Sequence, residues 1–147
     1  MKGKVLAVCR SKEKGTMKKE ISSGKLIKDY GLEGDSHRGK WHRQLSLLDK
    51  NSIDKMRGKG YEISHGDFAE NITTAGLDLY KLPVGQKIQI NNNIILEVTQ
   101  IGKKCHHDCE IAQKIGECVM PEEGIFARVI KGGIITAGDE IKVLDSI

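Results

Sequence analysis

KIQINNNIILEVTQI, residues 87–101, is the stretch that decides the fold. Two runs rich in β-branched residues flank three asparagines, and asparagine tolerates the left-handed backbone that a tight turn between strands requires. The pattern predicts a β-hairpin with strands over Lys87–Ile90 and Ile94–Gln100.

Similar short β-rich runs, separated by Gly, Asn and Asp, recur on both sides of this hairpin. A second hairpin is expected across Gly132–Gly133. This rhythm is typical of a mainly β barrel or sandwich. The other predicted strands are Lys4–Cys9, Lys25–Asp29, Gln44–Leu48, Phe126–Ile130 and Glu140–Leu144.

Helical patterns are few and short. Residues Asp49–Lys59 place Ile53 and Met56 on one face after an Asp or Asn cap, and Asp108–Ile115 has the same kind of pattern. No repeat or change of composition marks a linker, so residues 1–147 are expected to form a single domain.

Composition restricts the partners. The net charge is +4, from 24 basic and 20 acidic residues spread along the chain, which favours a small anionic ligand over nucleic acid. No apolar run is long enough for a signal-peptide core or a membrane span, so a cytoplasmic protein without a membrane partner is expected. The four cysteines are then expected to be reduced, with Cys9 in the first strand as a small buried hydrophobe.

A charged loop precedes the strand near residue 45, in GLEGDSHRGKWHRQLSLL, residues 31–48. Its glycines allow a ligand to approach the backbone, and Arg38 and Arg43 can each hold a phosphate or carboxylate by two hydrogen bonds. The loop, with His37, is a candidate anion cradle; a solvated surface loop explains the same residues.

Polar residues at strand entrances form a second group of candidates. Glu70 and Asn71 could position a ligand or orient a catalytic partner, although an Asx-type turn before a strand accounts for both. Arg128, in GIFARVIKGG, is unusual in an apolar strand unless it faces a site or an acidic partner.

Cys105 is the best candidate nucleophile. It follows Lys103 and Lys104, precedes His106, and lies where a strand is expected to lead into a short helix. Positive charge and a helix N-terminus both favour the thiolate, so we expect a lowered pKa for this thiol.

Two alternatives use the neighbouring thiols. Cys105, Cys109 and Cys118 with His106 or His107 could bind zinc, but no second C-x2-C or H-x3-5-H pair completes the usual spacing, which argues against zinc. Cys109 or Cys118 could also act as a resolving thiol for Cys105.

Four sequence blocks occur in a fixed order along the chain: GLEGDSH (31–37), GDFAENITTAGLDLYKLPVG (66–85), IGKKCHHDC (101–109) and EGIFARVIKGGIITAGDEIKV (123–143). Together they resemble the MOSC family, the domain named after the C-terminal part of molybdenum cofactor sulfurases. The resemblance spans nearly the whole chain and implies a closed or nearly closed β-barrel of the pyruvate-kinase barrel type with two or more short helices.

The resemblance also implies a site. Family members are thought to carry sulfur as a persulfide received from a pyridoxal-phosphate desulfurase, or to hold the molybdenum cofactor with the same cysteine ligating the metal. By motif that cysteine is Cys105, for persulfide or molybdenum, and His37, Glu70 and Asn71 join it as catalytic candidates. Arg128 matches an arginine in the family's final block.

The leading hypothesis is therefore a sulfur carrier in molybdenum cofactor maturation, with a cysteine desulfurase as donor and molybdopterin or a molybdoenzyme as acceptor. Pyridoxal phosphate would enter only through the desulfurase. A cofactor-dependent reductase of N-hydroxylated compounds with a separate electron donor and a zinc-stabilised binding module are the alternatives, so enzyme activity is left open. The candidate cofactor-binding residues are Arg38, Arg43, Lys103, Lys104, His106 and Arg128.

Overall fold

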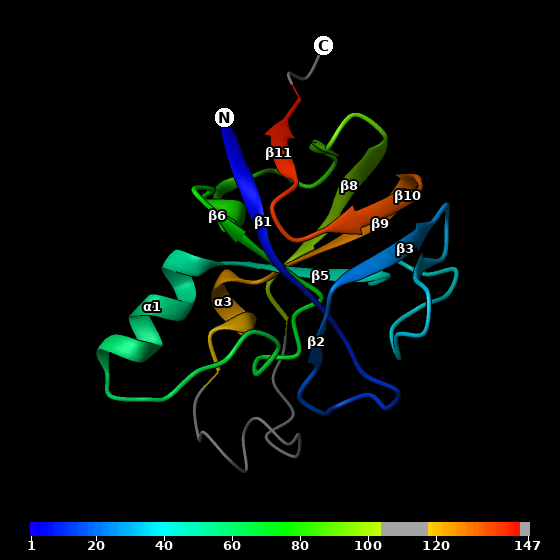
Figure 1. Cartoon of the computed structure of the whole chain (residues 1–147). Coiled ribbons are helices and arrows are strands. Elements are labelled where there is room, and N and C mark those ends of the chain that lie inside the picture. The colour runs from blue at the N-terminus through cyan, green and yellow to red at the C-terminus, as the bar shows by residue number, and fades with distance from the viewer. Residues whose placement is uncertain (104–117, 145–147) are drawn as a thin grey trace.

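The computed structural model describes residues 1–103 and 118–144. Within these residues the fold is mainly β, as predicted, and β1 pairs with β11 to close a barrel (Figure 1). All neighbouring strands in the barrel are antiparallel except β5 and β6, which are parallel. In order around the barrel the strands are β1 (Lys2–Arg10), β11 (Glu140–Val143), β7 (Lys87–Ile90), β8 (Ile94–Ile101), β9 (Ile125–Lys131), β5 (Leu45–Asp49) and β6 (Ile72–Ala75).

The β7–β8 hairpin is confirmed. Ile90 pairs with Ile94, and Asn91 begins the turn with a φ of 47°, in the left-handed region. Side chains in β8 alternate between buried and partly exposed from Ile94 to Thr99, so one face of the strand fills the barrel. The interior consists of Val, Ile, Leu and Ala side chains, as the scarcity of aromatics requires.

A smaller sheet lies outside the barrel, with β3 (Ser23–Ile27) between β4 (Gly31–Leu32) and β10 (Gly133–Thr136). The expected hairpin across Gly132–Gly133 is wrong, because β9 pairs inside the barrel while β10 crosses to β3. A Cβ on Gly132 would lie 2.2 Å from the carbonyl oxygen of Leu26. The glycine thus permits a close crossing between the two sheets.

Helix α1 (Lys50–Gly58) connects the parallel strands β5 and β6, which cannot be joined by a tight hairpin. Asp49 caps it by accepting a hydrogen bond from the backbone N–H of Asn51, and Ile53 and Met56 are buried as predicted. The second expected helix, Asp108–Ile115, lies outside the described residues.

The face of the barrel beside α1 carries a second apolar cluster. Two further short helical segments follow β6 and precede β9, namely η1 (Leu79–Lys81) and α3 (Met120–Glu123). Phe68, Met120 and Phe126 belong to the cluster, which packs between α1 and the barrel. None of the helices among the described residues has the length and hydropathy needed to cross a bilayer.

Candidate functional site

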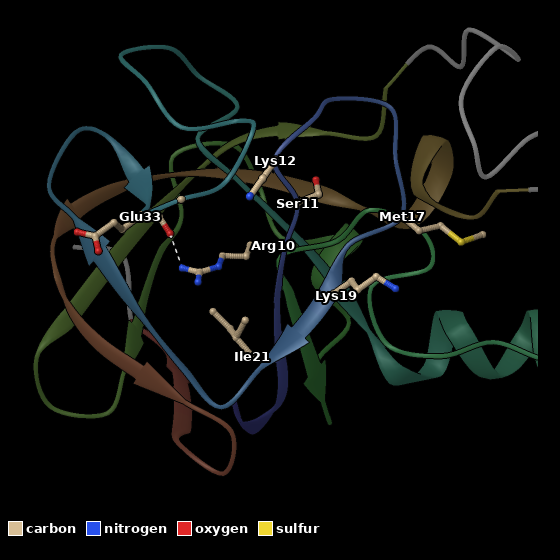
Figure 2. Close-up of a pocket in the computed structure, with 8 residues that line it drawn as sticks. Arg10, Ser11, Lys12, Met17, Lys19, Ile21 and Glu33 are labelled. Carbon is tan, nitrogen blue, oxygen red and sulfur yellow. Dashed lines mark hydrogen bonds between the residues drawn. The ribbon is translucent and has the colours of Figure 1, made fainter.

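A cavity of about 570 Å³ opens between the end of β1, the short strand β2 (Lys19–Ile21) and the loop after β4 (Figure 2). Basic side chains line it together with apolar Met17 and Ile21, and Arg10 donates a hydrogen bond to the carbonyl oxygen of Glu33. Its size suits a small organic ligand. The lining residues are Arg10, Ser11, Lys12, Met17, Lys19, Ile21, Glu33 and Gly34.

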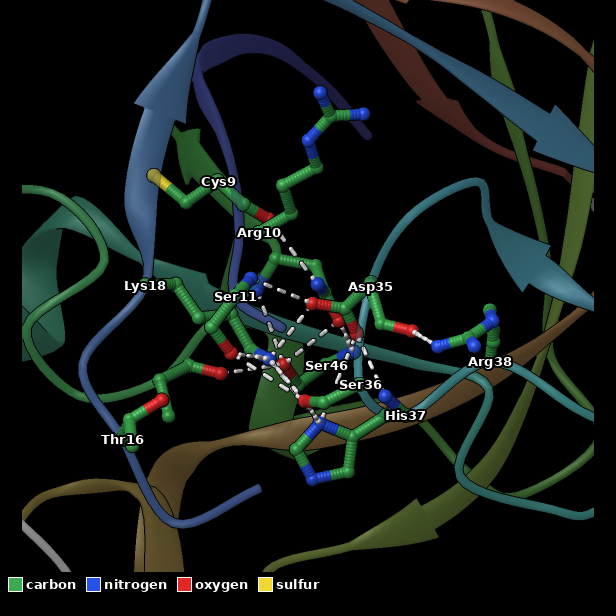
Figure 3. Close-up of polar contacts among 12 residues, drawn as sticks. Cys9, Arg10, Ser11, Thr16, Lys18, Asp35, Ser36, His37, Arg38 and Ser46 are labelled. Carbon is green, nitrogen blue, oxygen red and sulfur yellow. Dashed lines mark hydrogen bonds and ion pairs between the residues drawn. The ribbon is translucent and has the colours of Figure 1, made fainter. Parts of the chain in front are cut away.

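A buried ion pair lies beside this cavity (Figure 3). The Nζ atom of Lys18 lies 2.8 Å from Oδ1 of Asp35, and both side chains are fully buried. Lys18 immediately precedes β2, and Asp35 lies in the loop after β4. A buried charge pair must have its remaining hydrogen-bonding groups satisfied to be tolerated, and the neighbours of this pair meet that demand.

Three further side chains complete what we call the Lys18 network, formed by Ser11, Lys18, Asp35, Ser36 and His37. Asp35 accepts hydrogen bonds from the backbone N–H groups of Ser11 and His37. Lys18 Nζ lies 3.2 Å from Ser11 Oγ, 3.4 Å from Ser36 Oγ and 3.1 Å from His37 Nδ1. Since Ser11 also lines the cavity, the network reaches its wall.

The network changes the proton affinities of its members. Burial would raise the pKa of Asp35, but hydrogen bonds from His37 and the charge of Lys18 together hold that pKa well below its usual range. Burial lowers the pKa of Lys18 by more than Asp35 and Glu70 raise it, and the nearby charge of Lys103 lowers it further. Lys18 therefore gives up a proton more readily than an exposed lysine.

His37 connects the buried pair to the surface. Its side chain is 20% exposed, and its ring stacks on Trp41 with an interplanar angle of 3° and a centroid separation of 6.2 Å. Trp41 Nε1 donates to the carbonyl oxygen of His37, and Arg38 donates to that of Asp35. These bonds fix the loop, so His37 has a defined orientation toward Lys18.

Gly66 holds the other side of Lys18. Its carbonyl oxygen accepts a hydrogen bond from the backbone N–H of Lys18, its φ is +89°, and a Cβ there would lie 2.1 Å from the carbonyl oxygen of Lys18. Only glycine allows this approach without displacement of the backbone.

Glu70 and Asn71, expected as catalytic candidates, are both fully buried. Glu70 accepts hydrogen bonds from the backbone N–H of Phe68 and the hydroxyl of Thr73, and burial raises its pKa. The charge of Glu70 also raises the pKa of Lys18. Glu70 is not among the residues that line the cavity.

Asn71 joins two strands of the barrel. Its Nδ2 donates to the carbonyl oxygen of Cys9 in β1, and its Oδ1 accepts from the backbone N–H and the hydroxyl of Ser46 in β5. The expectation for Cys9 is confirmed: the residue is fully buried, and burial first, then the charge of Glu70, raises the pKa of its thiol to about 12.

The predicted cofactor-binding cations are dispersed. Arg43 donates to Gln100 and lies over the ring of Phe126, and Arg128 is 44% exposed and donates to Glu97 in β8. Neither lines the large cavity. Arg128 thus faces an acidic partner, one of the two roles expected for it, and Lys103 lies partly buried near Lys18.

Several predicted residues, Cys105, Lys104, His106, His107 and Cys109, lie outside the described residues. Cys118 is partly buried against the second apolar cluster. Within 1–103 and 118–144, no three His, Cys, Asp or Glu side chains gather as a metal site.

The sequence did not single out Ser11, Lys18, Asp35 or Ser36 as functional residues, although Asp35 and Ser36 stand in the block GLEGDSH. Lys18 stands in the polar run TMKKEI, where nothing in the local pattern marks one lysine as buried. A Gly-Asp pair followed by a histidine was the available signal for Asp35.

A family model described as the MOSC domain matches residues 34–142, which is 109 of the 147 residues. None of the curated proteins matches the sequence.

Solved structures share the fold. The YuaD protein from Bacillus subtilis is 22% identical with a TM-score of 0.79, and the match covers 97% of this chain and 96% of that one. YiiM from Geobacillus stearothermophilus is 17% identical with a TM-score of 0.74, covering 97% and 75%. YiiM from Escherichia coli is 20% identical with a TM-score of 0.68, covering 100% and 71%. At these identities the likeness supports the fold alone.

Proposed function

The chain belongs to the MOSC domain family, which is associated with the molybdenum cofactor, and we propose that it carries sulfur for that cofactor as a persulfide on Cys105. The observation that carries the proposal is the buried Lys18 network at the wall of a basic cavity. A charge pair of this kind is expensive to bury, and its position beside a ligand-sized cavity favours a chemical role.

The position of Cys105 in the sequence supports this role. Lys103 is close enough for its charge to act on Lys18, and Cys105 follows it by two residues. The positive charge of Lys103, two positions before Cys105 in the sequence, favours the thiolate.

The residues around the cavity fit a pterin cofactor that carries a phosphate. Arg10, Lys12 and Lys19 supply the cations that a phosphate requires, while Met17 and Ile21 offer apolar surface to a ring. When bound, the cofactor would supply a metal centre with sulfur ligands, which thiolate chemistry suits. Within this chain, the cavity residues would bind and orient the cofactor. The Lys18 network would hold a proton beside them.

The sulfur step is an exchange between two cysteines. The Cys105 thiolate attacks the terminal sulfur of the desulfurase persulfide, the sulfur–sulfur bond of the donor breaks, and a new one forms on Cys105. The donor cysteine leaves as a thiolate and takes up a proton from solvent. The sulfane sulfur moves without net oxidation, so no further oxidant is needed.

Intact mass spectrometry tests the carrier role. The full chain is incubated with a cysteine desulfurase, cysteine and pyridoxal phosphate, without reductant. We expect the mass of one sulfur atom to be gained by the wild type and by Cys109→Ser, and not by Cys105→Ser. Equal loading of Cys105→Ser and the wild type would refute the assignment of the carrier cysteine.

Elemental analysis tests the cofactor role on protein purified from cells that make the cofactor. We expect molybdenum to copurify with the wild type and with Lys142→Gln, a distant exposed control, and to be lost from Arg10→Gln. Equal molybdenum in Arg10→Gln and the control would argue against the cavity. The same measurement reads zinc, so it also tests the zinc-module hypothesis; the reductase remains a prediction of the sequence.

A further inference from the structure

Ser11 is the member of the Lys18 network that lines the large cavity, and the sulfur exchange on Cys105 does not use it (Figures 2 and 3). Ser11 Oγ lies 3.2 Å from Nζ of Lys18, and Ser36 Oγ lies 3.3 Å from Ser11 Oγ and 3.4 Å from the same Nζ. Two hydroxyls and an amine are therefore within hydrogen-bond reach of one another at the cavity wall. A serine hydroxyl becomes a nucleophile when an adjacent base can take its proton, and lysine is one of the bases known to do so.

Lys18 can act as that base once it is neutral, and His37 offers a route for the proton it must lose. The Lys18 ammonium has three acceptors, Asp35, His37 and Ser11, whose atoms lie 2.8, 3.1 and 3.2 Å from Nζ. In the tautomer with an unprotonated Nδ1, His37 can take one of these protons and pass it to solvent, because its side chain is 20% exposed. Lys18 then becomes an acceptor for the hydroxyl of Ser11.

The charges around Lys18 permit the neutral amine. Asp35 and Glu70 favour the ammonium, whereas burial and the charge of Lys103 oppose it, and the net effect lowers the pKa of Lys18. The carboxylate of Asp35 does not depend on Lys18 alone, since two backbone N–H groups donate to it. Asp35 can therefore stay charged after Lys18 loses a proton.

The cavity beside Ser11 suits a small anionic ester. Among the described residues that line it, three side chains are basic and one is acidic, while Met17 and Ile21 supply apolar surface. The backbone N–H groups of two lining residues, Lys12 and Gly34, form no hydrogen bond with any residue of 1–103 or 118–144. Such free donors suit the negative oxygen that develops when a hydroxyl attacks an ester carbonyl.

We propose that Ser11 is a nucleophile that hydrolyses small anionic carboxylic esters, with Lys18 as its general base. Ser11 Oγ attacks the carbonyl carbon while its proton moves to Lys18 Nζ, and the ester bond breaks as Lys18 returns that proton to the leaving alcohol. Water then attacks the acylated Ser11. Lys18 takes a proton from this water and gives it to the departing serine oxygen, so water is the one co-reactant and nothing is oxidised or reduced.

A fluorophosphonate probe, which reacts covalently with activated serines, tests the nucleophile. The full chain is incubated with the probe, and the adduct is located by peptide mass spectrometry. We expect one adduct on Ser11 in the wild type, in Cys105→Ala and in Ser64→Ala, which changes an exposed serine outside the network, and none in Ser11→Ala. A wild-type chain without an adduct on Ser11 would overturn the proposal.

The double variant Lys18→Met with Asp35→Leu tests the base without leaving a buried charge unpaired. We expect labelling of Ser11 to slow at least about hundredfold, since general-base catalysis contributes about 10²–10⁴-fold. Circular dichroism and melting temperature show whether the variant is folded. A folded double variant that is labelled at the wild-type rate would overturn the role of Lys18.

The pH profile of the wild type gives a second reading of the same base. The labelling rate is expected to rise with pH and to level off below the ordinary lysine pKa of about 10.4, because the pKa of Lys18 is lowered. A rate that still rises at that pH without a plateau would overturn the role of Lys18, whether or not the double variant folds.

Turnover is measured with 4-acetoxybenzoate and with its methyl ester, which lacks the negative charge. We expect the rate enhancement over the uncatalysed reaction to be about tenfold larger for the charged ester, and to be lost for both in Ser11→Ala. Equal enhancement of the two esters would overturn the anionic substrate class, and unchanged turnover by Ser11→Ala would overturn the nucleophile. Sulfur loading of Ser11→Ala is expected to equal that of the wild type, so this proposal and the sulfur-carrier proposal can fail separately.

Discussion

Replacing Asp35 by alanine is expected to destabilise the fold by about 3–5 kcal/mol, because it leaves the Lys18 ammonium buried without its counter-charge. The backbone N–H groups of Ser11 and His37 lose their acceptor in the same step. These two N–H groups are only partly buried, so water replaces part of what they lose and the unpaired charge of Lys18 dominates the cost. A domain of this size is stable by about 5–15 kcal/mol, so a large part of the stability is at stake.

Equilibrium unfolding in urea at neutral pH measures this loss. The double variant Lys18→Met with Asp35→Leu removes both charges and is expected to recover much of the stability, since apolar replacements of buried ion pairs are often neutral or stabilising. A loss below about 1 kcal/mol in Asp35→Ala would refute the reasoning, because it would mean that water satisfies Lys18.

The same pair predicts a pH dependence of stability. Because the pKa of Lys18 is lowered on folding, the unfolded chain binds more protons between that lowered pKa and about 10.4, and stability is expected to rise with pH across this window. The pKa of Asp35 is also lowered, so its contribution is present above about 3.9 and is lost as the pH falls through its folded value. Both components should be absent from the curve of stability against pH of the double variant Lys18→Met with Asp35→Leu.

Three other substitutions separate structural from chemical roles. Glu70→Gln is expected to raise the melting temperature at pH 7, because burial raises the pKa of Glu70 and so penalises its charged form. Sulfur loading is expected to stay unchanged. A lower melting temperature would contradict this. Asn71→Ala is expected to lose about 2–4 kcal/mol in urea unfolding, because it leaves buried groups on Cys9 and Ser46 unpaired, and a loss under about 1 kcal/mol would be inconsistent. Gly66→Ala is expected to lower the free energy of unfolding by about 1–3 kcal/mol, because Gly66 has a left-handed φ. The new Cβ is also expected to displace Lys18, which would change the backbone amide signal of Lys18 in NMR. An unchanged signal would count against this contact.

The barrel could be predicted because its strands carry local signals. Lys87–Ile90 and its partner strand alternate in burial around an asparagine turn, and both were found at nearly the expected bounds. The hairpin predicted across Gly132–Gly133 was wrong, because two glycines suit a tight turn and a close crossing between sheets equally well. Only the tertiary partner, here Leu26 in β3, decides between them.

The candidate site was less accessible to sequence reasoning. His37 could be singled out because it follows a Gly-Asp pair in a charged loop, and the structure places it in contact with Lys18. Lys18 itself could not, because its burial results from segments distant in sequence, Gly66 on one side and Asp35 on the other. Arg128 was marked by its charge in an apolar strand, yet the strand turns it toward Glu97 and a different hollow.

The seam between β1 and β11 has a kinetic consequence. It pairs Lys2 with Lys142, residues 140 positions apart, so the contact that seals the ring has the largest loop-closure entropy of any strand pair in the barrel. Ring closure should therefore be a late event in folding, and until it occurs two unpaired strand edges are open to other chains. The seam lies at the start of β1 and the cavity opens at its end. Weakening the seam would therefore promote aggregation during refolding before it changed the cavity.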